Sequence, residues 1–464
     1  MASMLPEGKK KENSPKFYFP IPFLNTSPKA EINLLIYLIP VWWLLGFQFF
    51  IFQFLVLLMF VKFFITKLRK KEAIYLPQDA LILLFFIMIY IASFTINIQN
   101  VQVYRALGSL NNLSFWIMGC LIIIIIHNSI KKEHIIEILK AFRTLGAFIG
   151  AFVMGSLVLW LSGYRYIQIH SLLSMAFPET VSLEKAPIIE SALYPKVIIT
   201  EYVFNQLSPR AYGFFIYPAA LGGAMIFLIA LTLAYSKMAG KKRITSLPIL
   251  LLEFLALVLS LSRIAFLGLF LAWIVVSLYA NLKKRWLSFS ITLQVFLIVL
   301  IVFSLLVPPG QVINKMSELK KGSNITRMEL YELTLRLILQ RPLLGHGFKP
   351  REEEYPEPIG SHSMYLGTIL KTGILGFLVF CVFWIRLIIK WIRQKSMVKN
   401  DKILGPLWYY LGISLIGGLI WMITEDLDAP PVVSFLYFII LGLIISLDRL
   451  SNSESKKSGN NATF

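Results

Sequence analysis

Residues 245–281, TSLPILLLEFLALVLSLSRIAFLGLFLAWIVVSLYAN, decide the fold class of this chain. They form two apolar runs, 245–261 and 264–281, and Glu253 and Arg263 are their charged residues. A bilayer core needs ~20 mostly apolar residues per helix, and unpaired backbone polar groups are not tolerated in lipid. We therefore expect two membrane-spanning helices that meet near Arg263.

The same pattern recurs along the whole chain, which is 57% hydrophobic and 15% charged. The alternation typical of a membrane β-barrel is absent. The sequence therefore predicts an all-α, polytopic membrane protein of about twelve helices. The remaining spans are expected at 31–46, 48–67, 77–97, 110–130, 135–162, 211–236, 286–307, 363–393, 404–424 and 431–448. The first two could instead form one long helix, because only Gly46 and Gln48 interrupt them.

The formal net charge of +20 lies in short clusters between the apolar runs. This placement favours membrane orientation over nucleic-acid binding, because cytoplasmic loops carry an excess of Lys and Arg. The rule predicts that both termini are cytoplasmic, with a basic tail at 1–30, a single membrane domain at 31–448 and a polar tail at 449–464. The first tail is too long to read as a signal peptide.

Two long segments, 163–210 and 308–362, fall on the opposite, outer side together with the acidic stretch 425–428. Loops of this length in a compact protein are usually functional or disordered. Residues 325–341 mix apolar and charged positions at near-helical spacing, which predicts a helix that lies along the membrane surface.

His362 is the histidine best placed for chemistry, because it stands where the second outer segment re-enters the membrane. An imidazole there can reach water while its surroundings adjust its pKa, as a general base requires. The alternative is an interfacial histidine that caps a helix. Gly373 and Gly376 follow about one helical turn apart and suggest close helix packing.

Three arginines are expected on the same outer side: Arg210, Arg263 and Arg327. A guanidinium at the hydrocarbon boundary is costly and is often functional. Its planar fork suits a lipid phosphate. The alternative is that each arginine snorkels to lipid phosphates or anchors a helix end.

Metal and cysteine chemistry find little support in the sequence. Cys120 and Cys381 both lie in apolar runs, and no cluster has metal-ligand spacing. We expect no metal and no other cofactor. Glu253, a carboxylate inside a predicted span, could mark an ion pathway or could pair with an inward-facing base.

Three motifs give the chain a resemblance to the O-antigen ligase and oligosaccharide repeat-unit polymerase superfamily. His362 and Ser363 are followed by nine residues and then by Gly373-Ile-Leu-Gly376, similar to the ligase signature. Residues 327–348, RMELYELTLRLILQRPLLGHGF, and 259–269, LSLSRIAFLGL, resemble two further family stretches. Residues 210–223, RAYGFFIYPAALGG, resemble a fourth, although Tyr217 replaces a common Asn.

The resemblance implies a GT-C-like, metal-independent, inverting glycosyltransferase of the bacterial inner membrane. It would move a glycan from undecaprenyl pyrophosphate to the hydroxyl of an acceptor glycan or glycolipid on the non-cytoplasmic face. His362 would be the catalytic base, supported by Ser363, Gly373 and Gly376. Arg263, Arg327 and Arg210 would bind the pyrophosphate.

The resemblance leaves the acceptor open between an O-antigen ligase and a polysaccharide polymerase, with protein glycosylation ranked third. A rival of a different class is a multi-helix transporter or flippase of envelope precursors, which the helix count and Glu253 favour. A further alternative is an envelope role without catalysis.

Overall fold

The computed structural model describes residues 26–176, 187–203, 206–240, 245–280, 321–352, 355 and 357–460. Its helices are α1 (Pro28–Tyr37), α2 (Ile39–Leu45), α3 (Ile51–Arg69), α4 (Gln78–Asn97), η2 (Ile98–Asn100), α5 (Val103–Ser129), η3 (Lys132–His134), α6 (Ile135–Leu161), η4 (Leu172–Ala176), α7 (Pro187–Leu193), α8 (Pro218–Met238), α9 (Leu247–Leu259), α10 (Arg263–Ala280), α13 (Lys321–Gln340), α14 (Met364–Val398), α15 (Leu404–Trp421) and α16 (Pro431–Asn460). The strands are β1 (Ile167–Gln168), β2 (Lys196–Val203) and β3 (Gln206–Ala211).

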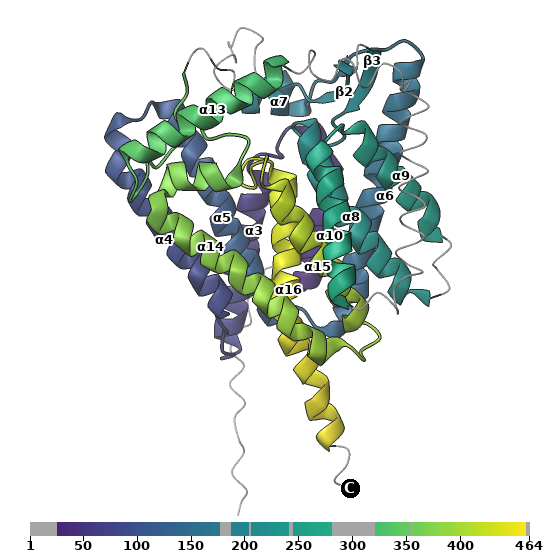
Figure 1. Ribbon diagram of the computed structural model, residues 1–464. Helices are drawn as coiled ribbons and strands as arrows, with labels where there is room; N and C mark the ends of the chain where they lie inside the picture. Colours follow the sequence, from purple (N-terminus) through teal and green to yellow (C-terminus); the bar gives the residue numbers. More distant parts are fainter. Residues whose placement is uncertain are drawn as a thin grey trace, which may run out of the picture.

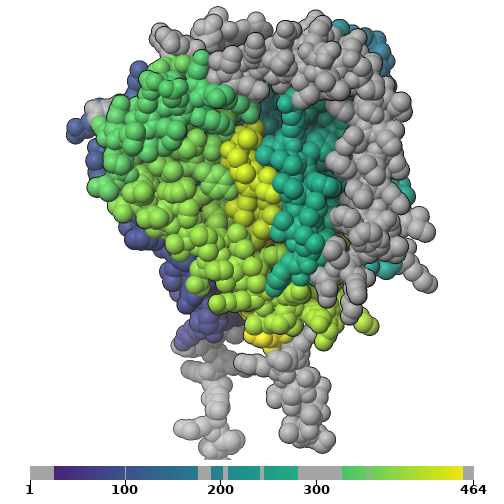
Figure 2. Space-filling view, in the orientation of Figure 1, coloured from purple at the N-terminus to yellow at the C-terminus, as the bar shows by residue number. Residues whose placement is uncertain are grey.

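The long helices form one bundle around α8 and α16 (Figure 1). Both central helices are apolar on nearly all sides and are buried along most of their length, as a helix surrounded by other helices must be. In Figure 2 the yellow C-terminal part of the chain shows between the green α13 and α14 and the teal helices of 206–280. The peripheral α3 instead exposes most of its apolar side chains, as expected where lipid covers a helix.

Nine helices of the described residues are long and apolar enough to cross a membrane. The predicted all-α, polytopic membrane fold is therefore confirmed for the candidate membrane spans. Two further predicted spans correspond to shorter helices, and 286–307 lies outside the described residues. The expected total of about twelve thus stays a prediction.

The first predicted span is a broken helix rather than a continuous one. α1 and α2 meet at Leu38, and Gly46 ends α2 with a left-handed φ of 84°. The turn at Gly46 packs against Ser171 and Leu173 of the first outer segment. This turn separates α2 from α3, so the alternative of one long helix over 31–67 is wrong.

The end of the bundle that carries α13 and the small sheet, the outer end, lies opposite the C-terminal end of α16 (Figure 1). The predicted helix over 325–341 is confirmed as α13 (Lys321–Gln340), and its position along the membrane surface stays a prediction. The first outer segment departs from a purely helical chain, because β1, β2 and β3 form an antiparallel sheet in that order.

Basic segments meet at the other end of the bundle. Lys390 pairs with Asp79 at 2.9 Å, and Lys132 pairs with Asp401 at 2.6 Å. Arg449 donates to the carbonyl of Ile130. The predicted cytoplasmic loops at 131–132 and 386–402 therefore share one end, as a single orientation in the membrane requires.

Candidate active site at the outer end of the bundle

His362 lies in the turn that leads into α14, with a left-handed φ of 62°. The Tyr331 hydroxyl donates to its carbonyl at 2.7 Å. Ser363 caps α14 by accepting from the Leu366 amide at 3.4 Å, as serine commonly does at a helix start. These two hydrogen bonds therefore fix the backbone at His362 and the start of α14 that follows it.

Helix α13 packs onto this turn through its inner face. Leu330 forms a small apolar cluster with Ile359 and Leu370. Thr334 accepts from the Gly360 amide at 3.0 Å. Arg327 lies one helical turn before Tyr331, so the face of α13 that holds the His362 turn also carries this guanidinium.

The environment of His362 keeps its imidazole neutral. Burial first, and then the charge of Arg327, lower its pKa to about 4, with a further contribution from Lys349 and an opposing one from Asp426. Burial penalises the charged form of a histidine, and a nearby guanidinium adds like-charge repulsion. His362 therefore offers an unprotonated nitrogen at neutral pH.

Glu425 lies in the loop between α15 and α16 and takes part in the same electrostatic cluster. Burial raises its pKa to about 8, against the charges of Arg327 and Arg210, while Asp426 and Glu357 add to the rise. The Glu425 carbonyl also accepts from the amide of Met364 at 3.2 Å. The structure thus groups Arg327, Arg210 and His362 around this loop.

Two buried lysine–aspartate pairs, which the sequence analysis missed, hold the loop. Lys349 Nζ lies 2.7 Å from Asp426 Oδ2. Lys371 pairs with Asp428, and each side chain is only 1% exposed. Trp116 Nε1 also donates to Asp428 at 3.0 Å. In the sequence, these pairs were signalled only by the acidic stretch 425–428 before the last apolar run. Lys349 and Lys371, the basic partners, lie far from it in sequence.

Arg210 is less free than the resemblance implies. It lies in β3 and pairs with Glu201 of β2 at 2.7 Å. Tyr217, which replaces the common Asn, is a buried residue before α8 whose pKa burial and Glu425 both raise. Arg210 therefore acts on Glu425 through its charge, while its guanidinium is paired with the Glu201 carboxylate.

Arg263 is the first residue of α10 and is exposed. The turn before it is tight, because a Cβ on Gly222 would lie 2.7 Å from Ser262 Cβ. In the part of the chain that the structure describes, no hydrogen bond or ion pair joins Arg263 to the His362 cluster. Its place in the site stays a prediction.

Gly373 does not serve the helix packing that its spacing suggested. It breaks α14 with φ 62° and ψ −170°. The turn 342–347 fills the break: Ile374 donates to the Pro342 carbonyl at 2.7 Å, and His346 and Gly347 donate to Leu370 and Lys371 at 2.8 Å.

A Cβ on Gly373 would lie 2.2 Å from the Leu343 carbonyl oxygen, so only glycine fits at this break. Gly376 does approach a neighbouring helix, since its Cβ would lie 3.3 Å from Ile89 of α4, although Thr372 Oγ1 of its own helix would lie nearer, at 2.2 Å. The helix-packing interpretation therefore holds for Gly376 alone.

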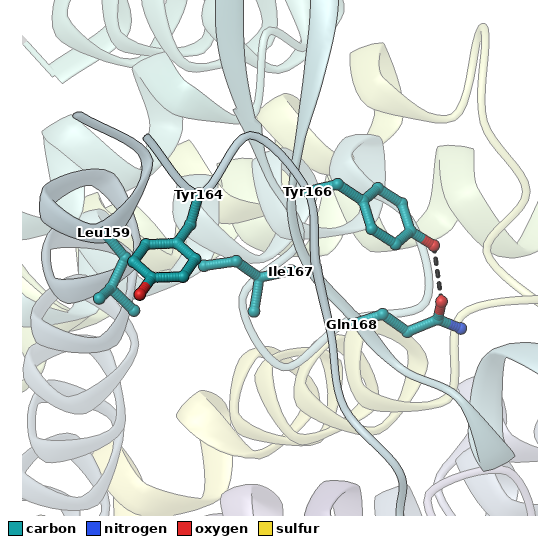
Figure 3. A pocket seen from close by; sticks show the side chains of 5 residues that line it. All are labelled: Leu159, Tyr164, Tyr166, Ile167 and Gln168. Atoms are coloured by element: carbon teal, nitrogen blue, oxygen red, sulfur yellow. Dashed lines mark hydrogen bonds between the residues drawn. The ribbon is translucent and has the colours of Figure 1, made fainter. Parts of the chain in front are cut away.

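Among the described residues, no group of three His, Cys, Asp or Glu side chains is arranged to hold a metal ion. A separate pocket of about 350 Å³ lies where α6 passes into β1. Its lining residues are Leu159, Tyr164, Tyr166, Ile167 and Gln168 (Figure 3).

The fold and the cluster define a class: a multi-pass helical membrane protein with a buried, charged site at one end of its bundle. A comparison with protein families narrows that class. Residues 248–381 match the family model described as O-Antigen ligase. This match confirms the resemblance to that superfamily and indicates a membrane function of the ligase or polymerase kind. No curated protein matches the chain.

The matched range runs from α9 to the middle of α14 and contains Arg263, Arg327, His362 and both motif glycines. Arg210 and the 425–428 loop lie outside it. The site as folded thus combines the matched segment with residues from two other parts of the chain.

Proposed function

We propose that this protein is an inner-membrane glycosyltransferase with His362 as its catalytic base. It moves a glycan from undecaprenyl pyrophosphate to an acceptor hydroxyl on the non-cytoplasmic face. The observation that carries the proposal is the placement of a neutral, partly buried His362 near Arg327, within the segment that matches the family model.

The proposed reaction is a single displacement. His362 takes the proton of the acceptor hydroxyl while that oxygen attacks the anomeric carbon from the side opposite the leaving group. The bond from the anomeric carbon to the pyrophosphate oxygen breaks, and the pyrophosphate leaves with the electron pair. Attack from the opposite side inverts the configuration at that carbon.

Arg327 and Arg263 neutralise the pyrophosphate as its charge grows, and Arg210 contributes once Glu201 releases it. Guanidinium groups bind phosphate oxygens in pairs, and such stabilisation of developing charge is usually the largest catalytic term. Two arginines make the pyrophosphate a competent leaving group, so the reaction needs no metal ion.

A bound pyrophosphate also activates the base. The free site lowers the pKa of His362 through burial and through Arg327. Negative charge at Arg327 offsets that repulsion, and an anion near an imidazole favours its protonated form. Donor binding would therefore raise the basicity of His362 when a proton has to be taken.

A transfer assay in detergent tests the proposal, with purified protein, an undecaprenyl-pyrophosphate-linked glycan and an acceptor glycolipid. We expect His362→Ala and Arg327→Ala to lower the rate by at least about a hundredfold. Arg336→Ala is the matched control, because Arg336 lies on the exposed side of α13 and pairs with Glu332.

All three variants should keep the melting temperature of the parent. Parent-like transfer by His362→Ala would overturn the assignment of the base. Product formed from donor alone identifies a polymerase, and product that requires a lipid A core acceptor identifies a ligase, which is the name we favour.

Glu253 carries the second candidate, a transporter. One carboxylate oxygen accepts from Thr232 at 2.7 Å, and the other has no partner among the described atoms at this buried position. Such a group can couple ion movement to transport. A transporter would move a precursor across vesicles in response to an ion gradient and would lose this on Glu253→Gln, whereas a transferase works without any gradient.

A further inference from the structure

The three-stranded sheet buries side chains on both of its faces, because Val197 is 5% exposed and its neighbour Ile198 is fully buried. Ile198 of β2 and Ala211 of β3 pair directly and are fully buried. Side chains alternate between faces along a strand. Arg210 and Glu201 therefore lie on the opposite face, where they pair at 2.7 Å.

Two tyrosines lie near these charges. The pKa of Tyr212 is raised, by burial first and then by Glu201 and Tyr166, against the charge of Arg210. Tyr212 therefore lies close to all three side chains. Tyr166 stands just before β1 and is 54% exposed.

The pocket of about 350 Å³ lies at β1, on the edge of the sheet away from β3. Figure 3 shows Tyr164, Leu159 and Ile167 on one side, and Tyr166 with Gln168 on the other. The Tyr166 hydroxyl donates to Gln168 Oε1 at 2.7 Å, and Gln168 Nε2 donates to the Tyr194 carbonyl at 3.0 Å. The amide and the tyrosine thus hold one another in place before any ligand arrives.

This combination of groups fits a saccharide. A pyranose ring has an apolar C–H face that packs on an aromatic ring, and hydroxyls at its edge that bond amides and carboxylates. A tyrosine that only anchors a helix at the membrane interface needs no amide such as that of Gln168 beside it. Tyr164 adds a second exposed ring on the far side of the pocket.

The register of the sheet sets the distance between Arg210 in β3 and the pocket at β1. Ile167 of β1 pairs with Ile198, which pairs with Ala211, the neighbour of Arg210. Adjacent strands lie about 4.8 Å apart, so β1 and β3 are separated by roughly 10 Å. A disaccharide spans that distance.

We propose that the pocket at β1, formed by Tyr164, Tyr166 and Gln168, binds the first sugars of the lipid-linked donor. The inference rests on the proposed function for the identity of the donor. The binding itself requires no transfer step.

Binding of free oligosaccharide tests the site directly. The probe is the repeat-unit oligosaccharide of the host's own envelope glycan, freed from lipid by mild acid. Saturation-transfer NMR titrations with the full-length protein in detergent measure its Kd. We expect Tyr166→Ala to weaken binding about fivefold to tenfold, since the stacking surface is lost.

Tyr75→Ala is the matched control, because Tyr75 is also an exposed tyrosine and its backbone amide donates to Asn128 in the last turn of α5. It should leave the Kd unchanged. Unchanged binding by Tyr166→Ala, or equal weakening by Tyr75→Ala, would overturn the site.

The His362→Ala variant distinguishes this inference from the proposed function. His362→Ala should bind the oligosaccharide as the parent does, even though we expect it to transfer nothing. If the parent protein transfers no glycan but binds the oligosaccharide through Tyr166, the saccharide site stands and the proposed function fails. In an active protein, Tyr166→Ala should raise KM for the donor and leave kcat unchanged.

Discussion

At the scale of single residues, the site depends on groups whose charge the surroundings change. His362 is neutral because it is partly buried near Arg327, and Glu425 is protonated because its burial outweighs two arginines. When fewer groups are ionised, the substrate-free site has a smaller desolvation penalty in its low-dielectric surroundings. The pyrophosphate head group of the proposed donor would bring negative charge to this site.

The pH dependence of catalysis follows from His362. A base works only when it is unprotonated, so activity should persist above its pKa and fall as the pH drops through it. Because kcat/KM reports the free enzyme, its acidic limb should lie near pH 4 rather than near 6.5. Rates at low donor concentration across pH 3.5 to 8 measure this limb, and a limb at 6.5 or above would contradict the buried environment of His362.

At the scale of elements, α14 is built around a break rather than along a continuous helix. The turn 342–347 supplies the hydrogen bonds that the break leaves open, and the same turn connects α13 to the Lys349–Asp426 pair. The position of His362 therefore depends on the fit between this turn and Gly373.

Gly373→Ala should lower the free energy of unfolding by at least ~2 kcal/mol, because the added methyl meets Leu343 and φ is left-handed. Gly108→Ala in α5 is the control, since a Cβ there meets nothing within 4 Å. That substitution should be neutral or stabilising by up to about 1 kcal/mol. Thermal unfolding in detergent compares the two, and equal melting temperatures would show that the break tolerates a side chain.

The Lys371–Asp428 pair joins the outer end of α14 to the loop before α16. Lys371→Met alone should destabilise by about 3–5 kcal/mol, because it leaves a buried carboxylate without its partner. The double variant Lys371→Met with Asp428→Leu should recover most of that loss, since no unpaired charge remains. A double-mutant cycle of melting temperatures measures the coupling, and simple additivity would argue against it.

At the scale of the whole molecule, the outer end collects residues from four distant parts of the chain. The sheet, α13, the His362 turn and the 425–428 loop gather there, while the basic segments pair at the other end. This asymmetry is what a site that meets lipid-linked substrate on one side of a membrane requires.

Labelling of single cysteines in intact cells tests this arrangement, after Cys120 and Cys381 are replaced. We expect Tyr164→Cys to react with a membrane-impermeant maleimide from outside. Glu72→Cys, in the turn after α3, should react only after the inner membrane is opened. Labelling of both positions from the same side would contradict the proposed orientation.

The sequence by itself determined the class of the protein and the motif residues. Apolar length predicts helices because lipid leaves the backbone no other partners, and the helices lie where these runs do. The motifs pointed to His362 and Arg327, which the fold brings together. The 286–307 span and the place of Arg263 remain predictions.

Only the tertiary structure decided which distant residues complete the site. Lys349 and Lys371 pair with aspartates about sixty to eighty positions away, and no local pattern encodes such a pairing. The break at Gly373 looked like a helix-packing glycine, because spacing along a helix does not reveal that a turn enters it. The pairing of Arg210 with Glu201 could not be predicted either, because strand register, and not distance along the sequence, places the two side chains together.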